Sequence, residues 1–186
     1  MAIDAGVDIF GENYVQEAIK KIEALTDLPI HWHFIGHLQS KKAKYAVRYF
    51  DLIHTVDSLK LAVALDQQAK KIHKVQDILV QVNVAMEPTK SGVKVEDVFS
   101  LVKDISSLEN LSVKGLMTMP PYFDSPEKSR PFFKALAELK QAIGEQSIPN
   151  IIMKELSMGM TDDFETAIDE GATLVRIGTA IFGERQ

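Results

Sequence analysis

The chain is built around one stretch near its end, Leu174-Val175-Arg176-Ile177-Gly178-Thr179-Ala180-Ile181-Phe182-Gly183. Apolar residues flank a single arginine in Leu-Val-Arg-Ile, which indicates a short buried strand, and Gly-Thr then opens a turn. A charge at the end of a buried strand needs a partner, because an unpaired charge costs several kcal/mol. Either the Gly178 backbone and the Thr179 hydroxyl hold a phosphate while Arg176 faces the rest of the ligand, or Arg176 pairs with a core carboxylate. These residues alone leave both interpretations open.

Length and composition limit the class of protein. The 186 residues, 46% of them hydrophobic, suit a single domain over 1–186. The net charge is −5, and the basic residues are dispersed except for Lys41, Lys42 and Lys44, so we expect no nucleic-acid partner and no membrane-surface role. The chain has no cysteine, no signal-peptide pattern and no apolar stretch near the roughly 20 residues that span a bilayer. These features are compatible with a cytoplasmic protein.

Strand and helix patterns alternate along the whole chain. Strands are predicted over residues 7–13, 30–36, 52–57, 78–84, 113–119, 155–159 and 174–177, and helices over 14–25, 38–49, 58–72, 95–108, 131–143 and 161–170. This order favours a parallel sheet with right-handed crossovers, either an open doubly wound sheet or a closed barrel. Short loops, ligand groups at several strand ends and a phosphate-like site after the last two strands favour the (β/α)₈ barrel.

Seven strands are visible, whereas a (β/α)₈ barrel needs eight. Residues 1–6 are typical of the last turn of a helix that ends at Gly6. The sequence therefore predicts a TIM-type barrel whose first strand and most of whose first helix are missing at the N-terminus. Such a barrel has two unpaired edges, so we expect the isolated chain to be poorly soluble or to associate.

A second phosphate-like motif precedes the first. The run 157–162, Ser-Met-Gly-Met-Thr-Asp, places a hydroxyl and a glycine where a strand leads into a helix N-terminus. Free amides and the helix dipole favour an anion there, although an ordinary helix capped by Thr161 explains the run better when it is taken alone. Because the loops after the last two strands hold phosphate in many barrels, the combination with Gly178 and Thr179 favours an anion site.

Two further groups stand at strand ends. His31 and His33 share a face of one strand, and His-x-His binds zinc in some barrel hydrolases, but the later strands supply no further histidine. We therefore expect no metal site and interpret His33 as a hydrogen-bonded core or pocket histidine. The amide of Asn13 can bond a ligand at the barrel mouth or fix the following turn.

Together these motifs resemble the pyridoxal phosphate homeostasis protein family, the YggS/PROSC group. The match covers the whole chain, and its two small departures are His37 where proline is common and Lys41 where asparagine is common. The matching runs are Phe10-Gly11-Glu12-Asn13-Tyr14, Trp32-His33-Phe34-Ile35-Gly36-His37-Leu38-Gln39-Ser40-Lys41-Lys42, Lys90-Ser91-Gly92, Gly115-Leu116-Met117, Leu156-Ser157-Met158-Gly159-Met160-Thr161-Asp162-Asp163 and Val175-Arg176-Ile177-Gly178-Thr179-Ala180-Ile181-Phe182-Gly183.

The resemblance implies a barrel like that of alanine racemase, without a second domain, that carries pyridoxal phosphate. It implies that Ser157, Gly178 and Thr179 hold the phosphate, that Arg176 faces the pyridine nitrogen and that Asn13 lines the side of the ring. Arginine cannot accept a proton, so the ring nitrogen stays neutral and the cofactor is a weak electron sink. This favours a non-enzymatic role in cofactor buffering or delivery, with transient contact to pyridoxal phosphate-dependent apoenzymes.

The large departure from the family is the lysine that carries the cofactor as a Schiff base, which no residue of this chain matches. Either the sequence is truncated, or this form binds the cofactor non-covalently. Two other functions stay open: a cofactor-free remnant or interaction protein, and an amino-acid racemase. A racemase needs a second base, commonly a tyrosine from another domain, and no tyrosine here has a clear claim to that role.

Overall fold

Seven parallel strands form one curved sheet. The structure, a computed structural model, describes residues 2–87 and 90–183. The strands follow the order β1-β2-β3-β4-β6-β7-β8, and a two-residue strand, β5, adds to β4. The bounds are β1 Ile9–Glu12, β2 His31–Phe34, β3 Leu52–Val56, β4 Gln76–Asn83, β5 Val93–Lys94, β6 Leu111–Met117, β7 Ile151–Met160 and β8 Leu174–Arg176. The seven predicted strands and their parallel pairing are confirmed, and β5 is a strand that the pattern does not predict.

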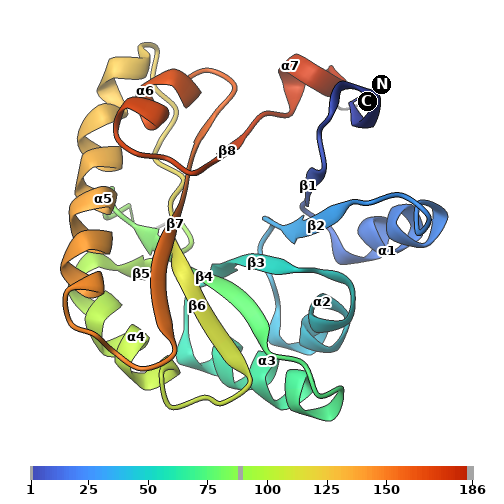
Figure 1. Ribbon diagram of the computed structural model, residues 1–186. Coiled ribbons are helices and arrows are strands. Elements are labelled where there is room, and N and C mark those ends of the chain that lie inside the picture. Colours follow the sequence, from blue (N-terminus) through green and yellow to red (C-terminus); the bar gives the residue numbers. More distant parts are fainter. Residues whose placement is uncertain (1, 88–89, 184–186) are drawn as a thin grey trace.

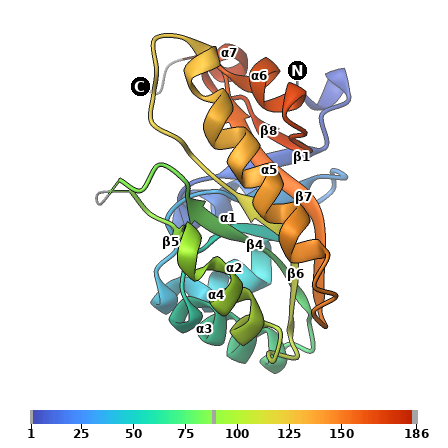
Figure 2. The same ribbon diagram turned by 90° about the vertical axis from the view of Figure 1, so that its left-hand side faces the viewer.

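Helices cover the outside of the sheet, which curves into a barrel that stays open between β1 and β8 (Figure 1 and, turned by 90°, Figure 2). Within the described residues β1 pairs only with β2, and β8 only with β7. The longer helices are α1 Val15–Ala24, α2 Ala43–Tyr49, α3 Leu59–Lys71, α4 Val98–Ile105, α5 Arg130–Gly144 and α6 Phe164–Asp169, and α7 Thr179–Phe182 is a single turn. Short 3-10 turns are η1 Ile3–Ala5, η2 Ser40–Lys42, η3 Val95–Asp97 and η4 Pro126–Lys128. Gly6 ends η1 in the left-handed conformation, as expected.

The core has two apolar layers. The outer layer lies between the sheet and the helices, where Phe34 of β2 packs on Phe50 with ring centroids 5.1 Å apart. The inner layer is a small cluster inside the barrel, made by Leu52, Leu79 and Met117 with Leu174 packed against them. Because alternate residues of a strand face the same side, the residues two positions after Leu52 and Leu174 also face the interior. Polar interior side chains at these positions, His54 and Arg176, therefore lie next to the inner cluster, which we call the apolar floor of the barrel interior.

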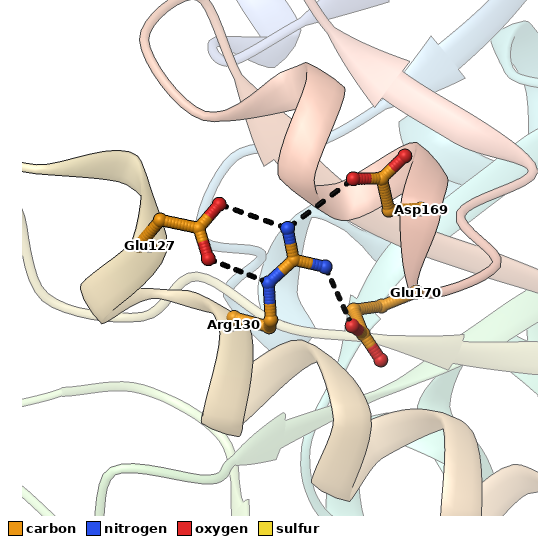
Figure 3. A network of polar contacts seen from close by, with 4 residues as sticks. All are labelled: Glu127, Arg130, Asp169 and Glu170. Atoms are coloured by element: carbon orange, nitrogen blue, oxygen red, sulfur yellow. Dashed lines mark hydrogen bonds and ion pairs between the residues drawn. The ribbon is translucent and has the colours of Figure 1, made fainter.

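An ion-pair network joins the start of α5 to the end of α6 (Figure 3). The Arg130 guanidinium donates to both oxygens of Glu127 at 2.7 and 2.8 Å, to Glu170 at 2.8 Å and to Asp169 at 3.2 Å. Hydrogen bonds to the three carboxylates, that to Glu127 first, raise the pKa of Arg130. We expect Arg130→Met to lower the free energy of unfolding by more than the loss of a single surface ion pair, because a network loses its centre and three carboxylates are left to repel. Urea denaturation measures this loss.

Lys128→Met is the matched control. Lys128 also pairs with a carboxylate at 2.6 Å, that of Asp124, but both side chains are largely exposed and no third partner among the described residues joins them. An exposed pair of this kind contributes roughly 0.3–0.5 kcal/mol. Equal losses from the two variants would show that the Arg130 network adds nothing beyond an ordinary surface pair.

One predicted boundary is wrong in a way that matters for the site. The pattern places the end of the sixth predicted strand at residue 159, but β7 continues through Met160, and α6 begins only at Phe164 with Asp163 as its N-cap. The extension arises because β7 pairs with β8 as far as Met160 opposite Arg176. Ser157 lies inside β7, as in the predicted strand over 155–159, whereas Thr161 lies in the loop before α6 and does not cap that helix. The described residues include no helix with the length and apolar character that a membrane crossing needs.

Candidate functional site

A cavity of about 1140 Å³ opens between β1 and β8. Its walls come from both edges of the sheet and from the loops after β7 and β8, so it lies at the carboxyl ends of the strands, where barrels place their ligands. Four of the five site residues predicted from sequence line this cavity: Asn13, Arg176, Gly178 and Thr179. The fifth, Ser157, is fully buried and lies behind Arg176.

One end of the cavity is suited to an anion. The hydroxyl oxygens of Thr161 and Thr179 are 3.2 Å apart, one from each of the two loops. Gly178 lies between Arg176 and Thr179, and a Cβ added to it would meet no atom within 4 Å. The first amide groups of α7, which starts at Thr179, have no acceptor within the helix. Open space, two hydroxyls and free amides together are what a phosphate group requires.

Arg176 lies deeper in the cavity, below the end that is suited to an anion. Its Nη1 donates to Ser157 Oγ at 2.6 Å, and its Nη2 donates to the Thr118 carbonyl oxygen at 2.8 Å. Burial lowers the pKa of Arg176 to about 10, and the charge of Asp163 opposes that shift. The guanidinium is therefore charged at neutral pH, and within the described residues it donates to a hydroxyl and a backbone carbonyl but to no carboxylate. Of the two interpretations of the sequence, the geometry favours a ligand-facing arginine over one paired with a core carboxylate.

A buried hydrogen-bonded chain continues from Ser157 across the barrel. Ser157 Oγ lies 2.9 Å from His54 Nδ1, and His54 Nε2 lies 3.0 Å from His33 Nδ1. Burial, followed by the charges of His33 and Arg176, holds the pKa of His54 well below its ordinary value. Burial also lowers the pKa of His33, with Asp51 opposing and His31 reinforcing the shift. Both imidazoles are therefore neutral near pH 7, and both line the cavity.

The position of Ser157 follows from a bulge in β7. Between Ser157 and Met160 the register with β8 shifts, and Gly159 adopts a positive φ of 88°. A side chain at Gly159 would collide with α6, because its Cβ would lie 2.5 Å from that of Ala167. The bulge leaves Ser157 in the barrel interior and carries the chain on to Thr161 at the cavity. The hydroxyl next to Thr179 is thus that of Thr161, and a phosphate role for Ser157 stays a prediction.

The open side of the cavity carries one ion pair. Lys21 Nζ lies 2.6 Å from Glu12 Oε1, and Lys21 is the one lysine among the described residues that line the cavity. In the described parts of the chain, no group of three or more metal-ligating side chains is arranged to hold a metal ion. His33 is buried and hydrogen-bonded, which confirms its interpretation as a core or pocket histidine.

Sequence patterns point to only part of this site. Arg176, Gly178 and Thr179 stand out because a charge and a turn interrupt an apolar run. His54 gives no comparable signal, since a single histidine in the all-buried strand β3 is more often a core residue. His54 lies two residues after Leu52, so the two side chains face the same side of the strand. This hint becomes informative only when the interior face of the sheet is known.

Known proteins resemble this chain over nearly its whole length. Residues 1–186 match the family described as alanine racemase, N-terminal domain. The pyridoxal phosphate homeostasis protein of Aquifex aeolicus is 48% identical over 183 residues, 98% of this chain and 79% of that protein. The protein of the same name from Escherichia coli K12 is 41% identical over 191 residues, 99% of this chain and 79% of its own length.

Solved structures agree with this likeness. PipY of Synechococcus elongatus PCC7942, solved with PLP bound, is 39% identical and superposes with a TM-score of 0.90, covering 98% of this chain and 84% of that one. An alanine racemase of Clostridium difficile superposes with a TM-score of 0.75 at 17% identity, covering 96% of this chain and 46% of its own. At that identity the likeness shows the fold, which is the barrel of alanine racemase.

Proposed function

Because this chain belongs to the pyridoxal phosphate homeostasis protein family, we propose that it binds pyridoxal phosphate in the cavity between β1 and β8 and takes part in its homeostasis. The observation that carries the proposal is the pairing of two loops at one end of that cavity. Thr161 and Thr179 face each other at 3.2 Å, beside a glycine with open space and above a charged arginine.

The described residues fit the cofactor in size and chemistry. The hydroxyls of Thr161 and Thr179 and the first amides of α7 would hold the phosphate. Arg176, set deeper, would donate to the pyridine nitrogen, and Asn13, directly after β1, would line the side of the ring. The polar groups thus meet the two ends of the ligand. Apolar side chains of the wall, among them Ile9, Ile35 and Met119, can cover its faces.

The same residues favour storage over catalysis. When bound, pyridoxal phosphate supplies an electron sink whose strength depends on a protonated ring nitrogen. Arg176 has a pKa of about 10, so at neutral pH it is a charged donor with no acceptor, and a ring nitrogen that it contacts must accept from it and stay unprotonated. We therefore propose a non-enzymatic role in which the cofactor is buffered and passed to apoenzymes. The expected rate of alanine racemisation by the cofactor-saturated protein is that of free cofactor alone.

A titration tests binding directly. Adding pyridoxal phosphate to the protein should produce a saturable change in its absorption spectrum that pyridoxal, lacking the phosphate, does not produce at the same concentration. Borohydride reduction and mass spectrometry then report whether any lysine, Lys21 included, is linked to the cofactor. A spectrum that is the sum of free protein and free cofactor at every concentration would contradict the proposal.

Thr179→Val should weaken binding about tenfold, because a hydrogen bond to a charged group contributes about 1.5 kcal/mol. Thr161→Val should cost a similar factor, since its hydroxyl oxygen lies 3.2 Å from that of Thr179. Thr173→Val is the control, because Thr173 lies between α6 and β8, and its hydroxyl bonds Glu155 and the Leu156 amide. Equal affinity of all three variants in the same titration would place the phosphate elsewhere.

A further inference from the structure

Three interior side chains connect Arg176 to the opposite wall of the barrel, and the resemblance assigns no such role to them. We propose that Ser157, His54 and His33 form a one-way hydrogen-bonded chain that positions Arg176 for contact with the ring nitrogen of the ligand. This inference rests on the proposed function, since it concerns the same cavity. Ser157 and His54 are positioning residues, because they act on the ligand through Arg176.

The hydrogen-bonded chain supplies one of the two contacts that hold the Arg176 guanidinium. Nη2 of Arg176 is fixed by the Thr118 carbonyl at 2.8 Å, and Nη1 by Ser157 Oγ at 2.6 Å. A planar group held at one nitrogen can rotate about that contact, whereas two anchors fix its plane. Ser157 thus decides which way the remaining N–H groups of Arg176 point.

Ser157 is itself held from the far side. Its hydroxyl is fully buried and meets His54 of β3, which is separated from β7 in the sheet by β4 and β6. His33 of the neighbouring β2 meets the other nitrogen of His54. The chain therefore spans the interior, above the apolar floor of Leu52, Leu79, Met117 and Leu174.

The direction of the chain follows from which groups can donate. An arginine has no acceptor, so Ser157 Oγ accepts from Arg176 and its own proton needs another partner. In this fully buried site the acceptor within reach of that proton is His54 Nδ1 at 2.9 Å. A neutral His54 then carries its proton on Nε2 and donates to His33 Nδ1, which leaves the proton of His33 on Nε2. Both imidazoles are thereby fixed as Nε2–H tautomers.

The opposite direction leaves a group unsatisfied. If His54 Nδ1 donated to Ser157, the Ser157 oxygen would accept two bonds, and its buried proton would have no acceptor among the described residues. An unsatisfied buried donor is costly compared with a satisfied one. The direction from Arg176 to His33 is therefore the one that the structure supports.

The test compares two ligands on matched variants. Pyridoxal phosphate and its 1-deaza analogue, which has a C–H group in place of the ring nitrogen, have nearly the same shape and differ in the acceptor that Arg176 would contact, so the ratio of their dissociation constants reports that contact. We expect the wild-type protein to prefer pyridoxal phosphate by about tenfold or more. In Ser157→Ala and His54→Leu the ratio should fall below about threefold. In His54→Gln it should stay near the wild-type value, because the glutamine amide offers one donor and one acceptor.

The outcomes separate this inference from the proposed function. Failure of the wild-type protein to bind either ligand would overturn the proposed function and this inference with it. Tight binding by all variants with an unchanged ratio would overturn the positioning role alone, and a His54→Leu variant that weakens both ligands equally would show a merely structural histidine. Nitrogen-15 NMR of the imidazoles supplies a ligand-free readout: Nε2–H tautomers support the chain, and a proton on His54 Nδ1 overturns it.

Discussion

Replacing Gly115 with alanine should destabilise the protein severely. Gly115 lies in β6, where the registers with both neighbours, β4 and β7, shift. A Cβ at this position would lie 1.9 Å from the Glu155 carbonyl oxygen and 2.7 Å from its carbon. These are backbone atoms, so the clash is relieved only by separating β6 from β7. We expect a loss of roughly 4 kcal/mol or more, a large share of a typical total of about 5–15 kcal/mol.

Thermal and urea unfolding of the variant measure this loss, and Gly144→Ala is its control. Gly144 is the last residue of α5, and a Cβ there would meet Met153 at 3.6 Å, an ordinary contact. Because alanine favours the helix over glycine, the control should be neutral or more stable by up to about 1 kcal/mol. A Gly115→Ala protein that melts within a few degrees of wild type would mean that the strands are not packed as described.

The sequence predicts a structural feature well where the residues of a single strand are enough to determine it. The seven strands were predictable because each is a short apolar run between turn signals, and their parallel order follows from the intervening helices. Strand ends were less predictable: β7 runs to Met160 because pairing with β8 extends it, which its own residues do not indicate. The same holds for β5, whose two residues depend on β4.

In the candidate site, too, some residues could be predicted from their local sequence and others could not. Arg176, Gly178 and Thr179 are adjacent in sequence, so their local pattern reveals them. The chain from Ser157 to His33 joins strands that are far apart in the sequence, and its direction depends on burial and on proton counting at each atom. The predicted association through unpaired edges stays a prediction, since β1 and β8 each pair with one neighbour in the described residues.

Arg176→Met should have opposite effects on binding and on stability. Removal of the guanidinium takes away the donor to the ring nitrogen and the charge beneath the phosphate end, so affinity for pyridoxal phosphate should fall about 100-fold, or about 3 kcal/mol. The ligand-free protein should unfold at an unchanged or higher temperature. Burial lowers the pKa of Arg176 to about 10 from 12.5, which means that the fold disfavours its charge. Neutral pH lies below both values, so the full cost is present there and the substitution relieves it.

Because affinity should fall while the unfolding temperature should not, this variant tests whether Arg176 serves ligand binding or the stability of the fold. The methionine chain fills similar space. Ser157 Oγ and the Thr118 carbonyl both lose their bonds to the guanidinium, but the Ser157 hydroxyl keeps His54 as a partner, so only the Thr118 carbonyl loses its side-chain donor without another. Scanning calorimetry with and without cofactor measures both effects in one preparation: the wild-type protein should gain stability from the ligand, and the variant should gain little. If the ligand-free variant instead melts several degrees lower than the wild-type protein, Arg176 stabilises the fold. That result would contradict its proposed role as a group kept for ligand binding.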